Sequence, residues 1–490
     1  MGKGFGFLLG AALGLMAIPA LAGAPMAQVT GPIAQPDVPG TPTHNYSFFA
    51  SNHDLASHGY VEEEYFIKGT ATSFKTGGTA TSDVLATGQP YYTRFVVRRP
   101  INAKRFNGTA IVEWYNVSNF FDAENVWFDD WEDMMRSGYV WVGVSPQTVG
   151  VEALKKWSPK RYAGFTVGKE VAATPTSPPR PPGSPDLDAM SFDIFTQVGY
   201  ALKHPGSVDP LGGLRPKILL ATGQSQSAGR LATYVNNIQP LAKVYDGFML
   251  DAAATPIRSD LTVPVLRLMA EHDVVTSGAA TRQPDTDKFR QWEVAGTSHM
   301  SRHVRESREA MELRDNGLSL EAKMAPLCAT PQVGTRTPMG QVVAAAFAGL
   351  SKWAQGGKPP AIAPKLDITQ VNKAPKQSVV AKNADGLAQG GIQLAAVAVP
   401  TQINLGVNAP SAASQEAGIH GEAIGAGACV RWGPSTDMTV AQLKAKYPSH
   451  ADYVAKVRQV TQANVAKGFL LKADGDEQIR AAEMSQVGSW

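Results

Sequence analysis

The chain has 490 residues, of which 43% are hydrophobic and 18% are charged. This is the composition of a globular protein with a large core, and it argues against a fibrous or disordered chain. The formal net charge is only +3, with acidic and basic residues interspersed, so we expect no nucleic-acid partner. We expect one domain over residues 23–490, with an insert or cap around residues 150–190 and a C-terminal extension around 358–490.

The first 22 residues have the features of an export signal. Lys3 supplies a positive charge, and the apolar run 5–18 is shorter than the roughly 20 residues that span a bilayer. Pro19 ends the run, and residues 20–22 (Ala-Leu-Ala) form a small-x-small cleavage pattern. We therefore expect cleavage near Ala22 and a periplasmic or secreted mature chain with no membrane span; an uncleaved anchor is the alternative.

Cys328 and Cys429 are the two cysteines of the chain. In an oxidising compartment they could form one disulfide, and the alternative is two buried thiols. Neither lies in a CxxC or other metal-ligand pattern. The sequence does not decide between the disulfide and the two free thiols.

The first half of the chain predicts a sheet with flanking helices. Residues 60–67 and 91–98 combine aromatic and β-branched residues, which is typical of antiparallel strands. An apolar run, a helical segment ending at a glycine and a second apolar run then follow, at 109–114, 130–136 and 139–144. This order favours a right-handed βαβ unit and therefore a parallel sheet.

Later segments continue the alternation. Helices are predicted at residues 191–203, 228–236, 341–353, 440–447 and 450–465, strands at 217–222, 244–250, 263–269 and 292–294, and short strands within 378–408. The Pro-rich segment 173–186 is either a plain surface loop or part of a cap over a site.

The sharpest functional signal is Gly223-Gln-Ser225-Gln-Ser227, between a buried strand and a helix. This is the context of a nucleophile elbow, in which a tight turn exposes a serine and small residues must flank it. Ser225 is the predicted nucleophile, because Gly223 then follows the strand directly. Ser227 is the alternative, and a turn without chemistry is a further one.

Two later residues fit the order serine, acid, histidine. Asp273 follows the strand 263–269, and His299 follows the strand 292–294. A histidine can take the hydroxyl proton of serine near neutral pH, and a buried carboxylate holds the imidazole in the required tautomer. Glu271 is the alternative acid.

An oxyanion hole is expected from the backbone N–H of Gln226 and from one N–H after the strand ending at Trp114, namely that of Tyr115 or Asn116. We expect no metal and no cofactor. His299 and His303 are four residues apart, but Met300 replaces the glutamate of the zinc-protease pattern.

At these motifs the chain resembles a bacterial family of exported α/β-hydrolase-domain proteins without an assigned substrate. The resemblance covers nearly the whole mature chain and rests on residues 61–66, 112–118, 139–147, 223–227, 390–393 and 468–471. It implies the α/β-hydrolase fold, a mostly parallel sheet flanked by helices, with Ser225, His299 and Asp273 or Glu271 as the triad. Gln393 stands where such patterns often have arginine.

We therefore expect an exported serine hydrolase that cleaves a carboxylic ester, small or polymeric, through an acyl-enzyme on Ser225. An acyltransferase with the same triad and a non-catalytic binding protein on a hydrolase scaffold are the alternatives, and a peptidase would need the same residues. The aromatic residues Trp114, Tyr115, Phe120, Phe121 and Trp127 either line an acyl pocket or belong to the core. The sequence does not determine the oligomeric state.

Overall fold

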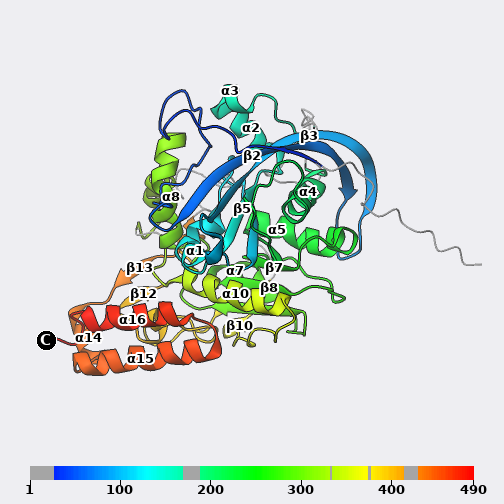
Figure 1. Cartoon of the computed structure of the whole chain (residues 1–490). Coiled ribbons are helices and arrows are strands. Elements are labelled where there is room, and N and C mark those ends of the chain that lie inside the picture. Colours follow the sequence, from blue (N-terminus) through cyan, green and yellow to red (C-terminus); the bar gives the residue numbers. More distant parts are fainter. Residues whose placement is uncertain (1–26, 169–187, 332–333, 373–376, 413–428) are drawn as a thin grey trace, which may run out of the picture.

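A computed structural model describes residues 27–168, 188–331, 334–372, 377–412 and 429–490 (Figure 1). Its centre is a sheet of nine strands in the order β1-β2-β3-β5-β4-β6-β7-β8-β9. Neighbours from β1 to β5 are antiparallel, whereas every pair from β5 to β9 is parallel. Parallel neighbours require crossover connections, which here carry helices over the sheet.

The strands β4 to β9 are buried along their whole length, which explains why the sequence shows them as nearly continuous apolar runs. Val112 of β4 pairs with Val142 on one side and with Ala221 on the other, so β4 lies near the centre of the sheet. The strands are β1 Gln28–Thr30, β2 Tyr60–Lys75, β3 Asp83–Pro100, β4 Thr109–Trp114, β5 Val140–Val144, β6 Ile218–Gln224, β7 Gly247–Asp251, β8 Val265–Ala270 and β9 Phe289–Val294.

Helices cover both faces of this sheet. Trp114 packs its ring against Phe192 and Phe195 of α4, with centroids 5.6 and 4.9 Å away. Its neighbour Glu113 instead accepts hydrogen bonds from the first turn of α1. Because successive side chains of a strand point to opposite faces, α4 and α1 lie on opposite sides. The helices are α1 Asn125–Arg136, α2 Thr148–Trp157, α3 Pro159–Tyr162, α4 Ser191–Lys203, α5 Gln226–Thr233, α6 Gln239–Ala242, α7 Glu271–Thr276, α8 Arg302–Asn316, α9 Leu320–Met324, α10 Met339–Ala354, α11 Ala395–Ala398, α14 Val440–Lys446, α15 His450–Lys467 and α16 Lys472–Met484.

Strands β2 and β3 form a long antiparallel ribbon that arches over the rest of the molecule (Figure 1). The sequence predicted only the half of this ribbon that joins the sheet, at residues 60–67 and 91–98. The outer half contains glycine, threonine and alanine, and residues 83–88 are exposed, so no apolar alternation marks it.

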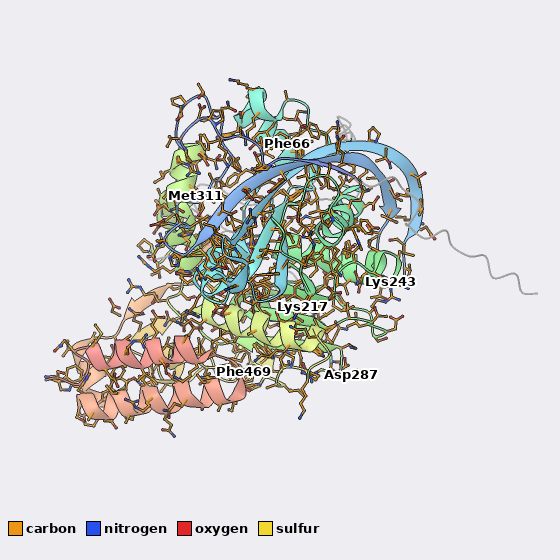
Figure 2. The ribbon with its side chains drawn as sticks, in the orientation of Figure 1. Phe66, Lys217, Lys243, Asp287, Met311 and Phe469 are labelled. Atoms are coloured by element: carbon orange, nitrogen blue, oxygen red, sulfur yellow. A yellow bond between two sulfur atoms is a disulfide. The ribbon has the colours of Figure 1, made fainter. Side chains whose placement is uncertain are left out.

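The C-terminal extension contains two small antiparallel sheets and a group of helices. The strand β10 (Ile368–Gln370) pairs with β11 (Val379–Val380), and β12 (Gln402–Asn404) pairs with β13 (Ser435–Asp437). The last helices, α14 to α16, lie together at one end of the molecule (Figure 1). Phe469, labelled in Figure 2, contacts Trp292 of β9 at 5.1 Å between ring centroids, which packs the extension onto the main sheet.

Cys328 and Cys429 form a disulfide, so of the two possibilities that the sequence left open the structure has the bonded one. The bond joins the segment after α9 to the extension across 101 positions of sequence. The predicted signal 1–22 and the Pro-rich segment 173–186 lie outside the described residues; of the expected insert around 150–190, the structure describes α2 and α3.

The predicted fold class is confirmed: a mostly parallel sheet with helices on both faces. Among the described residues, no helix has both the length and the apolar character that crossing a bilayer requires.

Candidate active site

Ser225 stands at a sharp turn between β6 and α5. The strand ends at Gln224 and the helix begins at Gln226, so Ser225 alone makes the turn. Its backbone has φ 61° and ψ −115°, a strained conformation that residues other than glycine rarely adopt. The Ser225 N–H donates to the carbonyl of Asp251 at 2.9 Å, and its carbonyl accepts from the N–H of Gly229 at 2.9 Å. The strained turn is therefore held from the sheet and from the helix.

Small residues flank this turn because there is no room for larger ones. A Cβ atom on Gly223 would lie 2.8 Å from Ser227 Oγ. The Ser227 hydroxyl accepts from the N–H of Gln224 and donates to the carbonyl of the same residue, each at 3.0 Å. Ser227, the alternative nucleophile, is fully buried, and its hydroxyl is engaged within the turn.

The imidazole of His299 lies between Ser225 and Asp273. His299 Nε2 is 2.8 Å from Ser225 Oγ, and His299 Nδ1 is 2.6 Å from Asp273 Oδ1. Asp273 belongs to the first turn of α7, directly after β8, and His299 follows β9. Both residues therefore stand at the carboxyl ends of parallel strands, where an open α/β sheet collects functional side chains.

The charge state of Asp273 suits this arrangement. Burial by itself would raise the pKa of Asp273, but the charge of His299 and the hydrogen bonds from His272 and His299 outweigh burial and hold the pKa well below its usual range. The Asp273 Oδ2 also accepts from the N–H of Ala270 at 3.0 Å. A fixed, ionised carboxylate can orient His299 and stabilise its protonated form while the imidazole takes a proton from a hydroxyl.

Glu271, the alternative acid, does not contact His299. Its buried carboxylate accepts from the N–H of Gly296 at 2.7 Å and from the N–H of Gly406 at 3.3 Å. Burial raises the pKa of Glu271. The structure thus brings Asp273 to the imidazole and uses Glu271 to join the loop after β9 to the C-terminal extension.

The loop that carries His299, residues 295–301, is held by segments far from it in sequence. The N–H of Ala295 donates to the carbonyl of Ile392 at 3.0 Å, and the N–H of Met300 donates to that of Arg431 at 3.2 Å. Sequence reasoning missed these supports, because backbone carbonyls leave no residue signature.

The expected oxyanion donors are only partly available. The N–H of Gln226, the first in α5, has no acceptor among the described residues. The N–H of Tyr115 donates to the Val144 carbonyl at 3.1 Å, and that of Asn116 donates to the Ala123 carbonyl at 2.9 Å. The structure therefore does not support Tyr115 or Asn116 as the second donor, because strand and turn hydrogen bonds already use both groups.

The next N–H along this loop, that of Val117, points to the residue after the Ser225 turn. It donates to the side-chain Oε1 of Gln226 at 3.3 Å. The Asn116 side chain also donates to the Gln224 carbonyl at 2.8 Å, which joins the loop to the end of β6. The N–H of Val117, bonded to the Gln226 side chain, and the N–H of Gln226 are thus the two groups on this side of the turn that no backbone acceptor among the described residues engages.

The buried carboxyl of Glu113 and a buried ion pair hold the start of α1. Both oxygens of Glu113 are used: one accepts from the N–H of Val126, and the other accepts from the N–H of Trp127 and from the Trp141 indole, at 2.9–3.0 Å. Arg98 pairs with Glu124 at 2.8 Å, and its guanidinium lies 4.5 Å from the ring centroids of both Trp127 and Trp141.

Most of the aromatic candidates belong to the core. Trp114, Tyr115 and Trp127 are buried, and Phe121 packs against Phe49 at 5.3 Å between centroids. Phe120 differs from them: it is 54% exposed and has a φ of 65°.

Among the described residues, one cluster has the donor set and spacing for a metal: His272, Asp273 and His299, with ligand atoms within 4.8 Å of one another. Hydrogen bonds of 3.0 and 2.6 Å from the two histidines to Asp273 Oδ1 account for this spacing. His303 is not part of it; it lies in α8, beyond the loop of His299, and pairs with Glu132 at 3.1 Å.

The model of a protein family described as "alpha/beta hydrolase domain" matches residues 29–480. The chain belongs to this family. The match spans the sheet, the turn at Ser225 and the C-terminal extension, so the extension is part of the family's domain. The search of curated proteins found no sequence that matches this chain.

Solved structures similar to this family member include α/β serine hydrolases and an esterase. A Xanthomonas campestris serine hydrolase without a lid is 12% identical, with 51% of this chain and 94% of that chain covered and a TM-score of 0.28. A serine hydrolase homologue from Coxiella burnetii is 12% identical over 50% and 96% of the two chains, with a TM-score of 0.25. The esterase Est22 is 12% identical over 63% and 84%, with a TM-score of 0.31. At such low TM-scores, they carry no argument about substrate.

Proposed function

We propose that this protein is an exported serine hydrolase that cleaves a carboxylic ester through an acyl-enzyme on Ser225. The observation that supports this most is the hydrogen-bonded series Ser225 Oγ, His299 Nε2, His299 Nδ1 and Asp273 Oδ1, with distances of 2.8 and 2.6 Å. The strained turn at Ser225 supports it as well, because such strain persists where the surroundings enforce it, commonly at active sites.

In the first half of the reaction, Ser225 Oγ attacks the ester carbonyl carbon while its proton passes to His299 Nε2. The negative charge then develops on the carbonyl oxygen, and Asp273 stabilises the imidazolium. His299 returns the proton to the leaving alcohol as the carbon–oxygen ester bond breaks. Water repeats the sequence on the acyl-enzyme and releases the acid, with no cofactor involved.

The N–H groups of Gln226 and Val117 are the proposed oxyanion donors. The Gln226 side chain now accepts from Val117, so a substrate oxygen would have to displace the Gln226 Oε1 atom. A distance of 3.3 Å marks a weak hydrogen bond, and an oxyanion is a stronger acceptor than an amide oxygen, so displacement is favourable.

Export is proposed from residues 1–22, and the disulfide between Cys328 and Cys429 supports it, because such bonds persist in oxidising compartments. The mature chain would then meet its ester, small or polymeric, in the periplasm or outside the cell.

The decisive test is an ester-library screen of the mature protein beside Ser225→Ala and Ser227→Ala, with fluorophosphonate labelling mapped by mass spectrometry. We expect hydrolysis and labelling at Ser225 in the wild type and in Ser227→Ala, and neither in Ser225→Ala. Equal hydrolysis by the wild type and Ser225→Ala would refute the assignment.

The same screen, extended with amide substrates and with acceptor alcohols, distinguishes the alternatives. Ester products formed with added alcohols in preference to hydrolysis would indicate an acyltransferase, and cleavage confined to amide substrates would indicate a peptidase. A wild type with no burst and no labelling would indicate a binding protein on a hydrolase scaffold.

A further inference from the structure

A second histidine contacts the carboxylate of Asp273. His272 Nδ1 lies 3.0 Å from Asp273 Oδ1, the same oxygen that His299 Nδ1 approaches at 2.6 Å. The two imidazole centroids are 5.2 Å apart. His272 is 6% exposed, so this contact is shielded from water.

The hydrogen-bond pattern determines which nitrogen of each ring carries a proton. A carboxylate oxygen only accepts, so Nδ1 carries the hydrogen in both histidines. This leaves the lone pair of His299 Nε2 to accept from Ser225 at 2.8 Å and, more weakly, from the side-chain amide of Gln224 at 3.4 Å. One carboxylate oxygen has two lone pairs, and here both are used. Because the other oxygen accepts from the N–H of Ala270, the carboxylate of Asp273 is held by three donors.

His272 is suited to donate without bringing a charge. Burial lowers the pKa of His272, and the charges of His299 and Arg431 lower it further, against the opposing effect of Asp273. These groups face it from three elements: Asp273 from α7, His299 from the loop after β9, and Arg431 from the C-terminal extension. The His272 backbone is itself tied to that loop, since its N–H donates to the Thr297 carbonyl at 3.2 Å.

We propose that His272 is a positioning residue for the proposed serine hydrolase: its Nδ1–H holds the Asp273 carboxylate in the orientation that His299 requires. The inference rests on the proposed function and adds to it a fourth side chain. Without His272, one lone pair of Asp273 Oδ1 is vacant and the carboxylate can rotate away from His299. His299 would then spend less time with Nε2 aimed at Ser225.

The test compares His272→Leu with His272→Asn, measured with a fluorophosphonate probe and with a short-chain nitrophenyl ester. Leucine removes the donor, whereas the asparagine amide places an N–H close to the position of His Nδ1. For His272→Leu we expect kcat and the labelling rate at Ser225 to fall about ten- to a hundredfold, the range for a lost hydrogen bond to a charged group, with KM unchanged. His272→Asn should recover most of this loss.

Rescue by the conservative variant gives a readout that a purely structural residue would not change. The labelling rate at Ser225 should fall in His272→Leu and recover in His272→Asn, with KM unchanged in both. The matched control is His303→Leu, the same change at a half-exposed histidine that pairs with Glu132, and its kcat should stay near that of the wild type.

The outcomes separate the proposed role of His272 from the proposed serine hydrolase activity. A labelled wild type with an equally reactive His272→Leu would overturn the role of His272 and leave the serine hydrolase intact. Equal loss in His272→Leu and His272→Asn, with a lowered melting temperature in both, would make His272 structural and also overturn the inference. A wild type that is never labelled would refute the serine hydrolase itself.

Discussion

Ser225 and His299 stand 2.8 Å apart, yet the structure holds them in different ways. Ser225 is fixed mainly by what adjoins it in sequence, the end of β6 and the start of α5, with one further hydrogen bond to the carbonyl of Asp251 in β7. His299 is fixed by distant segments, among them the carbonyls of Ile392 and Arg431 in the C-terminal extension. A local motif can thus specify the proposed nucleophile, whereas the proposed base depends on long-range packing.

Asp273 and Glu271 also differ in what they hold: Asp273 contacts His299, whereas Glu271 joins the loop of His299 to the C-terminal extension. Replacing each carboxylate by its amide gives the largest expected effect. Asp273→Asn would remove the charge that stabilises the His299 imidazolium and permit the wrong tautomer, so kcat should fall about ten thousandfold. Glu271→Gln keeps an acceptor for the N–H of Gly296 and should retain kcat within about tenfold, with unfolding free energy lowered by about 1–3 kcal/mol.

Ester hydrolysis and urea unfolding of the two variants provide the check. A collapse of kcat in Glu271→Gln, with Asp273→Asn active, would exchange the roles of the two acids.

Removing the disulfide tests how far the loop that carries His299, residues 295–301, depends on the C-terminal extension. Replacing both Cys328 and Cys429 by alanine opens a loop of about 100 residues, for which chain entropy predicts a loss of about 4–5 kcal/mol of unfolding free energy. Cys429 lies two residues before Arg431, whose carbonyl holds the N–H of Met300. The double variant should therefore label more slowly at Ser225 as well as unfold at lower urea.

Urea titration and labelling rates at one temperature separate the two effects. Reduced stability with unchanged labelling would show that the loop keeps His299 in place without this support.

The elements of the fold that local sequence determines were predictable, and those that depend on distant packing were not. The strands at 109–114 and 140–144 were predictable because both faces are buried and the residues are apolar throughout. Helix α8 (Arg302–Asn316) was not predicted, because its buried side chains include Arg305, Arg308 and Glu312, which obscure an apolar stripe.

The candidate site shows the same limit. Residue types together with their places after predicted strands indicated Ser225, Asp273 and His299, which the structure brings together. The second oxyanion donor could not be predicted from the sequence, because almost every residue offers a backbone N–H. Only the structure after β4 shows that the N–H groups of Tyr115 and Asn116 already donate to backbone carbonyls.

Alanine substitutions at two glycines near Ser225 test how strictly the turn requires small residues. An alanine Cβ at Gly223 would lie 2.8 Å from Ser227 Oγ, so Gly223→Ala should lower the unfolding free energy by about 1–3 kcal/mol and slow labelling. At Gly229, inside α5, a Cβ would meet nothing within 4 Å, so Gly229→Ala should raise the unfolding free energy by about 0.5–1 kcal/mol. Thermal melts of both variants test the pair; equal stability would mean that the turn tolerates a side chain.

The expected effect that depends on pH concerns Asp129, which accepts from Ser301 Oγ at 3.0 Å where α8 begins after His299. Burial raises the pKa of Asp129 to about 6, against the opposing effects of His303 and Ser301. Between about pH 4, where the unfolded carboxyl ionises, and pH 6, the folded state keeps a proton that the unfolded state releases. Stability from this group is therefore present at low pH and is lost as the pH rises through 6.

Asp129→Asn keeps an oxygen acceptor for Ser301 and cannot ionise. Its unfolding free energy should exceed that of the wild type by about 1–3 kcal/mol at pH 7.5, and by much less at pH 4. Urea unfolding at both pH values measures the difference. A gain of the same size at both would mean that it does not come from ionisation, and a loss at both would mean that the carboxylate itself supports the histidine loop.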